Sequence, residues 1–261
     1  MSARSGTSGL IWLAITLIAV SIATSAMGLF MDSWRTSDDD VEGKRGWGLT
    51  STSYDCSEIS DSDDKETCEA VGVILAIGYD DAVEKYGSGA DMPDEGSFAS
   101  SEMCDNYDEF AVALDITDDE DYKEGLDDCK DTHSAGQTGS IMLWIGFGGA
   151  IISLIMCFIT ALTRESGSRV SAGISALVAG LLMGAAVLTW SLMLPNGIGG
   201  EDDDWSASVN FYLTLVGAFL SLVAGIIAFV AVRRGGQNLN MPMQGASQQQ
   251  YYQQQEQHQQ W

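Results

Sequence analysis

GLIWLAITLIAVSIATSAMGLFM, residues 9–31, contains no charged side chain, and three further stretches share this property: 140–162, 170–194 and 209–232. Each stretch is longer than 20 residues, and about 20 helical residues cross a hydrocarbon core roughly 30 Å thick. None shows the polar face, at 3.6-residue spacing, of a helix in a soluble protein. The sequence therefore predicts an all-α membrane protein with a four-helix transmembrane bundle in the lipid bilayer.

The first apolar stretch has a second interpretation. Arg4, the apolar run and either Ala23-Thr24-Ser25 or Thr24-Ser25-Ala26 also fit a secretory signal peptide with its cleavage site. The run continues to Met31, which is longer than a usual signal core and favours a retained helix. Under both interpretations the loop that follows is exported.

The distribution of Lys and Arg predicts the orientation. The loop 195–208 has no Lys or Arg and contains four consecutive acidic residues, 201–204. The positive-inside rule therefore places 1–8, 163–169 and 233–261 in the cytoplasm, so that 32–139 and 195–208 lie outside the plasma membrane. The basic residues that decide this lie close to the ends of the apolar stretches: Arg4, Arg164, Arg169, Arg233 and Arg234.

Negative charge is concentrated in the loop 32–139, which has 31 acidic and 7 basic residues, a net charge of −24. This charge repels nucleic acid and anionic lipid, so neither is an expected partner. An exported surface adapted to high salt explains the acidity, because salt shortens the Debye length from about 8 Å toward about 3 Å. A surface that collects cations is the alternative.

The cysteines support export. Cys56, Cys68, Cys104 and Cys129 lie in the long loop, and Cys157 lies alone in the second apolar stretch. An even number of cysteines in an oxidising compartment indicates two disulfides. Three connectivities are open, and proximity in the sequence favours Cys56–Cys68 with Cys104–Cys129.

The long loop divides into two parts. Residues 32–55 have the composition of short strands and turns. Apolar residues then recur at helical spacing from Val71 to Ala82 and from Met103 to Leu114, and Thr117 with Glu120 forms a capping box for a third helix. A break is expected at 87–96, around Pro93. The loop is thus predicted to be a disulfide-stapled, mixed strand and helix extracytoplasmic domain.

One set of loop residues resembles a known family. Trp34, the segment Trp47-Gly48-Leu49 and the pair Cys56 and Cys68 follow the first apolar stretch in that order. This order resembles the Trp, Gly-Leu-Trp, Cys, Cys signature of the claudin and peripheral-myelin-protein superfamily of four-helix membrane proteins. Here the tryptophan precedes Gly-Leu, Thr50 takes the place of the family's aromatic residue, and a second cysteine pair is present.

The resemblance has structural implications. It implies an outer β-sheet with a Cys56–Cys68 bridge, in which Trp34 and Trp47 anchor the sheet against the bundle. Claudin-like membership also implies a role in contacts at the cell surface.

Small residues at four-residue spacing predict where the membrane helices pack, because they let backbones approach closely. A homo-oligomeric contact is open for any of these faces. They are Ala172, Ala176, Gly180 and Gly184 in the third stretch, Gly217, Ser221 and Gly225 in the fourth, and Gly149, Ser153, Cys157 and Ala161 in the second.

The motifs of common enzymes are missing. The sequence has two histidines, and it contains no Gly-x-Ser-x-Gly, His-Glu-x-x-His or phosphate-binding glycine loop. A non-enzymatic protein without a cofactor is therefore expected. Asp118, Asp119 and Asp121 are candidates for weak divalent cation binding, although Glu120 and Leu126 replace the Gly and Glu of an EF-hand.

The glutamine-rich tail has too little apolar content to fold and is expected to be disordered. Three functional hypotheses follow. The first is a surface protein that makes lateral or cell–cell contacts with itself or other membrane proteins. The second is a pore subunit with an acidic vestibule, and the third is a sensor or accessory subunit. The absence of ionisable residues from the apolar stretches disfavours a pump.

Overall fold

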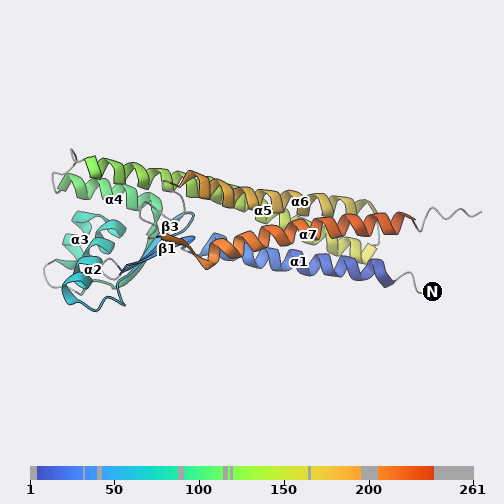
Figure 1. The fold of residues 1–261 in the computed structure, drawn as a ribbon, viewed down its shortest axis with the longest axis horizontal. Helices are drawn as coiled ribbons and strands as arrows, with labels where there is room; N and C mark the ends of the chain where they lie inside the picture. Colours follow the sequence, from blue (N-terminus) through green and yellow to red (C-terminus); the bar gives the residue numbers. More distant parts are fainter. Residues whose placement is uncertain are drawn as a thin grey trace, which may run out of the picture.

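The computed structural model describes residues 5–31, 33–39, 43–87, 91–113, 117, 120–163, 166–194 and 205–237. Four long helices form an elongated bundle, with a smaller head domain at one end (Figure 1). The bundle helices are α1 (Ser5–Phe30), α5 (Glu120–Thr163), α6 (Ser166–Met193) and α7 (Val209–Gln237).

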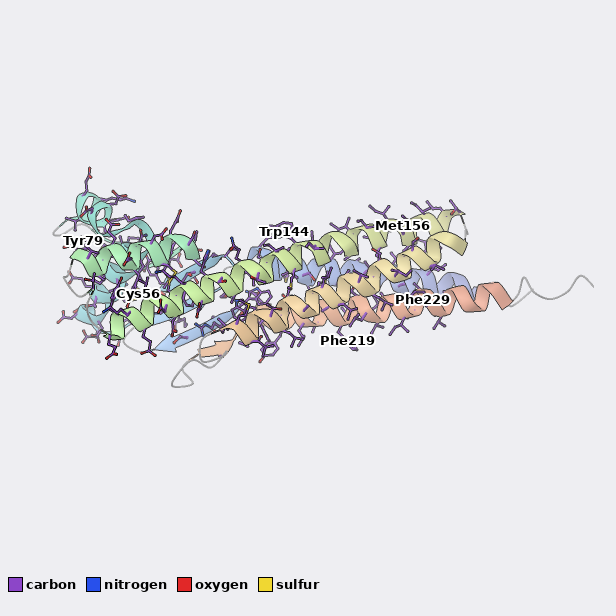
Figure 2. All side chains as sticks on the ribbon, turned by 90° about the horizontal axis from the view of Figure 1, so that it is seen from above. Cys56, Tyr79, Trp144, Met156, Phe219 and Phe229 are labelled. Atoms are coloured by element: carbon purple, nitrogen blue, oxygen red, sulfur yellow. A yellow bond between two sulfur atoms is a disulfide. The ribbon has the colours of Figure 1, made fainter. Side chains whose placement is uncertain are left out.

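Each bundle helix contains a segment long and apolar enough to cross a membrane, in agreement with the four predicted spans. The helices pack as a ring in the order α1, α5, α6, α7 and back to α1. The start of α1 and the end of α7 lie at the same end of the bundle, away from the head domain (Figure 1). Large apolar side chains such as Trp144 and Phe219 project from the bundle surface (Figure 2), where they are about half or more exposed. A membrane-embedded bundle accounts for this apolar exterior.

Helix α5 runs through the predicted boundary between the outer domain, 32–139, and the second membrane span, 140–162. It is one continuous helix of 44 residues, which at 1.5 Å per residue is roughly 66 Å long. Gly136 and Gly139 lie within the helix, where another segment packs closely against both: a Cβ at Gly136 would collide with the Leu49 carbonyl. The first half of α5 therefore belongs to the head domain.

The small-residue faces pack largely as predicted. A Cβ added at Gly180 would lie 2.8 Å from the Ala218 carbonyl oxygen on α7, and one at Gly225 would lie 3.0 Å from the Gly173 carbonyl oxygen on α6. Gly217 approaches α1 instead, where its Cβ would lie 2.8 Å from Ser25 Oγ. These close approaches leave room only for glycine.

Serine hydroxyls reinforce these contacts between helices. Ser221 on α7 donates to the Ala176 carbonyl on α6 at 2.8 Å, and Ser153 on α5 donates to the Ala172 carbonyl at 2.8 Å. Gly149 approaches Ala179 on α6, where its Cβ would lie 3.3 Å from the alanine Cβ. The predicted faces of the second, third and fourth apolar stretches are thus helix contacts within this chain.

Gly184 is the exception among the predicted packing residues. A Cβ added there would meet no atom within 4 Å, and the residue lies instead in an open apolar groove between α6 and α7, beside Leu181 and Phe219. Four-residue spacing alone therefore extended the predicted contact face one step too far.

The head domain is built on a five-stranded antiparallel sheet in the order β4-β3-β2-β1-β5. Its strands are β1 (Arg35–Asp39), β2 (Gly43–Trp47), β3 (Ser51–Asp55), β4 (Glu95–Ala99) and β5 (Trp205–Ala207). The three strands within 32–55 agree with the prediction. Strand β5, from the short loop before α7, and strand β4 were not predicted.

Three further helices, α2 (Ser62–Ile77), α3 (Tyr79–Tyr86) and α4 (Ser100–Ala113), complete the head domain. Helix α2 begins before Cys68 because the Asp61 carboxylate caps it, accepting from the backbone of Asp63 and Asp64. Gly78, with φ +87°, divides the single predicted helix in two. Gly87 ends α3, in agreement with the break expected at 87–96.

Candidate functional site

Trp34 joins the head domain to the bundle. Its side chain is fully buried, with its ring centroid 5.2 Å from that of Trp190 on α6 and 6.0 Å from that of Phe211 on α7. Its indole Nε1 donates to the Gly28 carbonyl at 2.7 Å, one of the last carbonyls of α1, which have no partner within the helix. Its backbone also pairs with Trp47 and Ser208. Trp34 thus has the anchoring position that the resemblance implied.

Trp47 occupies a different position from the one implied. It packs inside the head domain with the Cys104–Cys129 bridge and Met103, rather than against the bundle. The Arg35 guanidinium carbon lies 5.3 Å from the centroid of the Trp47 ring. Burial lowers the pKa of Arg35 from 12.5 to about 10, against the opposing effect of Asp128 on α5, so Arg35 remains charged at neutral pH. This cation–π pair joins β1 and β2 beneath α5.

Leu49 makes the bundle contact that was expected of Trp47. It is buried in the core cluster that contains Trp34 and Trp190. Its Cδ2 approaches Gly139 on α5, where a Cβ would lie only 3.2 Å away. Gly48, just before it, donates its N–H to the Ser51 carbonyl at 2.8 Å and so turns the chain from β2 into β3.

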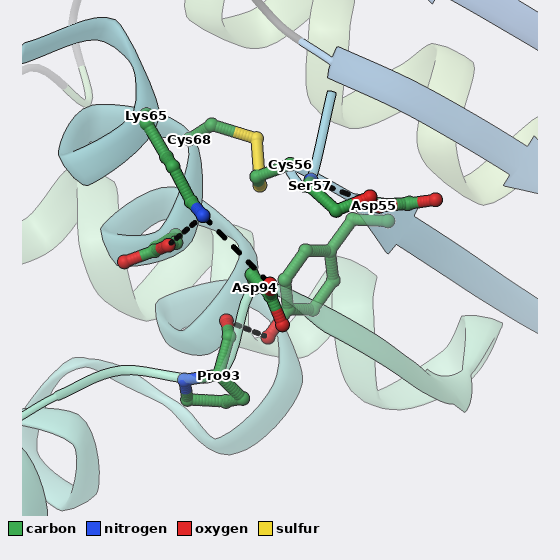
Figure 3. Close-up of polar contacts among 9 residues, drawn as sticks. Asp55, Cys56, Ser57, Lys65, Cys68, Pro93 and Asp94 are labelled. Atoms are coloured by element: carbon green, nitrogen blue, oxygen red, sulfur yellow. Dashed lines mark hydrogen bonds and ion pairs between the residues drawn. A yellow bond between two sulfur atoms is a disulfide. The ribbon is translucent and has the colours of Figure 1, made fainter. Parts of the chain in front are cut away.

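Two disulfides staple the head domain, and they are the pairs that sequence proximity favours. Cys56–Cys68 joins the end of β3 to α2, and Cys104–Cys129 joins α4 to α5. Around the first bridge, Lys65 lies 3.7 Å from both Asp94 and Glu69 (Figure 3). Each bridge therefore ties a helix to a neighbouring element of the same domain.

One sheet face is polar. Alternation along the strands places Thr36, Lys44, Ser53, Asp55 and Ser97 on this face, which we call the polar sheet face. It forms a shallow hollow of about 480 Å³. The Ser57 hydroxyl and backbone N–H donate to Asp55, and these bonds lower the pKa of that carboxyl (Figure 3).

The opposite sheet face and the helices enclose a second space, the inter-layer cavity, of about 480 Å³. Two charged residues, Arg45 and Asp64, contribute to its lining. Burial raises the pKa of Tyr54, whose hydroxyl donates to the Pro93 carbonyl at 3.4 Å (Figure 3). The rest of the lining is mainly aromatic and aliphatic: Trp47, Tyr54 and Phe98 from the sheet, Val71 and Leu75 from α2, and Met103 and Tyr107 from α4.

The predicted cation candidates cannot be placed together. Asp118, Asp119 and the side chain of Asp121 lie outside the described residues. Among the residues that the structure does describe, no group of three or more His, Cys, Asp or Glu side chains is arranged to hold a metal ion.

The sequence does not predict the inter-layer cavity, although it contains one signal for it. Thr52 and Tyr54 alternate with serines along β3, a pattern that places both side chains on one face of a strand. The helices that oppose this face could not be inferred from that pattern.

No protein-family model matches the sequence, and no curated protein matches it significantly.

Proposed function

We propose that this chain is a claudin-like, non-enzymatic component of the plasma membrane that makes lateral or cell–cell contacts through its head domain. The observation that supports this role is the way in which the polar sheet face is attached to the bundle. The sheet continues from α1 through Trp34 and from α7 through β5, so two bundle helices hold it directly. A sheet held at two points presents a surface of constant orientation, which lowers the entropic cost of association.

The chemistry of the polar sheet face suits a reversible contact. Thr36, Ser53 and Ser97 form one row of hydroxyl groups across the sheet, and the charged residues Lys44, Asp55 and Glu95 form the next row. Lys44 also forms an ion pair with Glu58 at 2.6 Å. Hydroxyl groups and charges of both signs fit a partner surface that is itself polar, as in non-obligate interfaces.

Site-specific photo-crosslinking tests this proposal. A benzophenone amino acid is placed at Ser53 or Ser97, and at Val83 on α3 as an exposed control remote from the polar sheet face. Two cell populations express the chain with different epitope tags. Adducts that carry both tags in mixed populations report cell–cell contact, and adducts from co-expressing cells report lateral contact. Equal yields from the three positions, or none from Ser53 and Ser97, would contradict the proposal.

The proposed orientation, with both termini in the cytoplasm, has its own test. Reporter fusions after Arg164 and Arg234 should report the cytoplasm, and fusions near Pro93 and Asp203 should report the outside. An external reporter at Arg164 would refute this arrangement of the helices.

A pore subunit is the second candidate, and the net charge of −24 in 32–139 favours it. A field of that sign raises the local concentration of cations. Because the spanning stretches have no ionisable residue, such a pore would lie between subunits. Purified protein in liposomes would then conduct cations in preference to anions, whereas a contact protein would leave the liposomes tight.

A further inference from the structure

We propose that the inter-layer cavity binds a small amphiphile with an apolar body and an uncharged or cationic head group. Its volume of about 480 Å³ falls in the range of roughly 300–1,000 Å³ that is typical of small-molecule sites. The lining also has the composition of such sites, in which apolar and aromatic side chains surround a few polar groups. This proposal does not rest on the contacts proposed for the polar sheet face.

The wall formed by Tyr54 is held in place from several sides. A Cβ added at Gly72 would lie 2.5 Å from the Tyr54 ring, and one added at Gly96 would lie 2.6 Å from it. The ring is thus held between α2 and β4, and its hydroxyl is bonded to the Pro93 carbonyl. Because Tyr54 is fixed in this way, the cavity does not close by rotation of the Tyr54 ring.

Water in a space with a mainly apolar lining leaves apolar surface exposed to water, which is unfavourable. Val71 and Phe98 line the space and are only partly covered. An apolar ligand body would cover this apolar surface. The cavity therefore favours occupation by hydrocarbon or aromatic groups over water.

Charge decides the kind of head group. Arg45 and Asp64 are of opposite sign, so the lining itself has no net charge. The loop around it has 31 acidic and 7 basic residues, a field that repels anions and attracts cations. Long-chain alcohols and quaternary ammonium compounds match these conditions, and fatty acids do not.

Photolabelling of the full chain in lipid nanodiscs tests the proposal. Three diazirine probes share one decyl chain and end in a hydroxyl, a trimethylammonium or a carboxylate group. Labelling of peptides 64–75 and 98–107 is divided by labelling of peptides from α6, which corrects for partition into the bilayer. We expect the first two probes to label the cavity peptides at least fivefold more than the carboxylate at low salt. This ratio should fall toward one in 1 M salt.

Variants that fill the cavity give the specific control. Val71→Phe or Leu75→Trp should each reduce the corrected labelling at least fivefold. Val112→Phe, a similar enlargement at an exposed position of α4 that does not line the cavity, should leave it unchanged. Unchanged disulfide pattern and α6 labelling report that the variants fold.

Three results would overturn the proposal. The first is cavity labelling no stronger than that of peptide 79–86 of α3. The second is labelling within twofold of the original chain in both filling variants. The third is a carboxylate probe that labels as strongly as the ammonium probe at low salt.

Discussion

Replacing Trp34 by Phe tests whether one hydrogen bond holds the head domain on the bundle. The change deletes the bond from the indole Nε1 to the Gly28 carbonyl, 2.7 Å long. Trp190 provides a matched control, because it is equally buried in the same aromatic cluster. Its indole nitrogen has no hydrogen-bond partner among the described residues. Both substitutions remove the same volume from one cluster, and only Trp34→Phe removes a bond.

The expected difference can be estimated from this comparison. A hydrogen bond contributes about 1 kcal/mol net, and a buried carbonyl left without a partner costs about 1–3 kcal/mol. Water that reaches Gly28 would reduce the second contribution. Trp34→Phe should therefore destabilise the junction by roughly 1–3 kcal/mol more than Trp190→Phe, which corresponds to about a 5- to 150-fold larger opening constant.

Hydrogen–deuterium exchange of the chain in nanodiscs measures this opening constant. Peptides that cover β1 and β5 report the junction, because Trp34 pairs through its backbone with Trp47 and Ser208. Exchange in these peptides should accelerate in Trp34→Phe and much less in Trp190→Phe, while α7 peptides exchange alike in both. Equal acceleration in the two variants would refute the argument that the indole N–H stabilises the junction.

Three further predictions concern packing, pH and salt. Gly180→Val should destabilise the bundle by about 1–3 kcal/mol through overpacking, whereas Gly184→Val should change it little because its Cβ meets open space; thermal unfolding in detergent compares the two. The bonds from Ser57 lower the pKa of Asp55 from 3.8, so the stability that this carboxylate contributes is present above pH 3.8 and is lost as the pH falls through the lower folded value. Asp55→Asn should therefore be less stable than the original chain at pH 7, and acid titration should make the two converge. The head domain should gain stability with salt because screening weakens the repulsion among its acidic residues. A melting temperature that stays flat from about 10 mM to 1 M salt would contradict this. Sodium and calcium solutions of equal ionic strength would distinguish screening from cation binding.

The features that were predicted correctly depend on local sequence. A long apolar stretch without charged residues indicates a membrane span, because every residue of the span lies in the hydrocarbon core. Strands at 32–55 follow from the composition of that segment, and the disulfide pairs follow from chain proximity. Gly180, Gly217 and Gly225 were also identified correctly, since close helix contact in a membrane depends on small residues.

The features that were missed depend on segments far apart in the chain. Strand β5 pairs with β1 across about 170 residues, Arg35 opposite Ala207, through backbone hydrogen bonds that any side chains permit. The unbroken α5 and the burial of Trp47 among the disulfide cysteines depend on what lies beside them. The inter-layer cavity is the space left between two layers, which no single segment encodes. Local patterns therefore determined the membrane helices, the strands within 32–55 and the disulfides, and only packing in three dimensions decided the remaining strands and which residues meet.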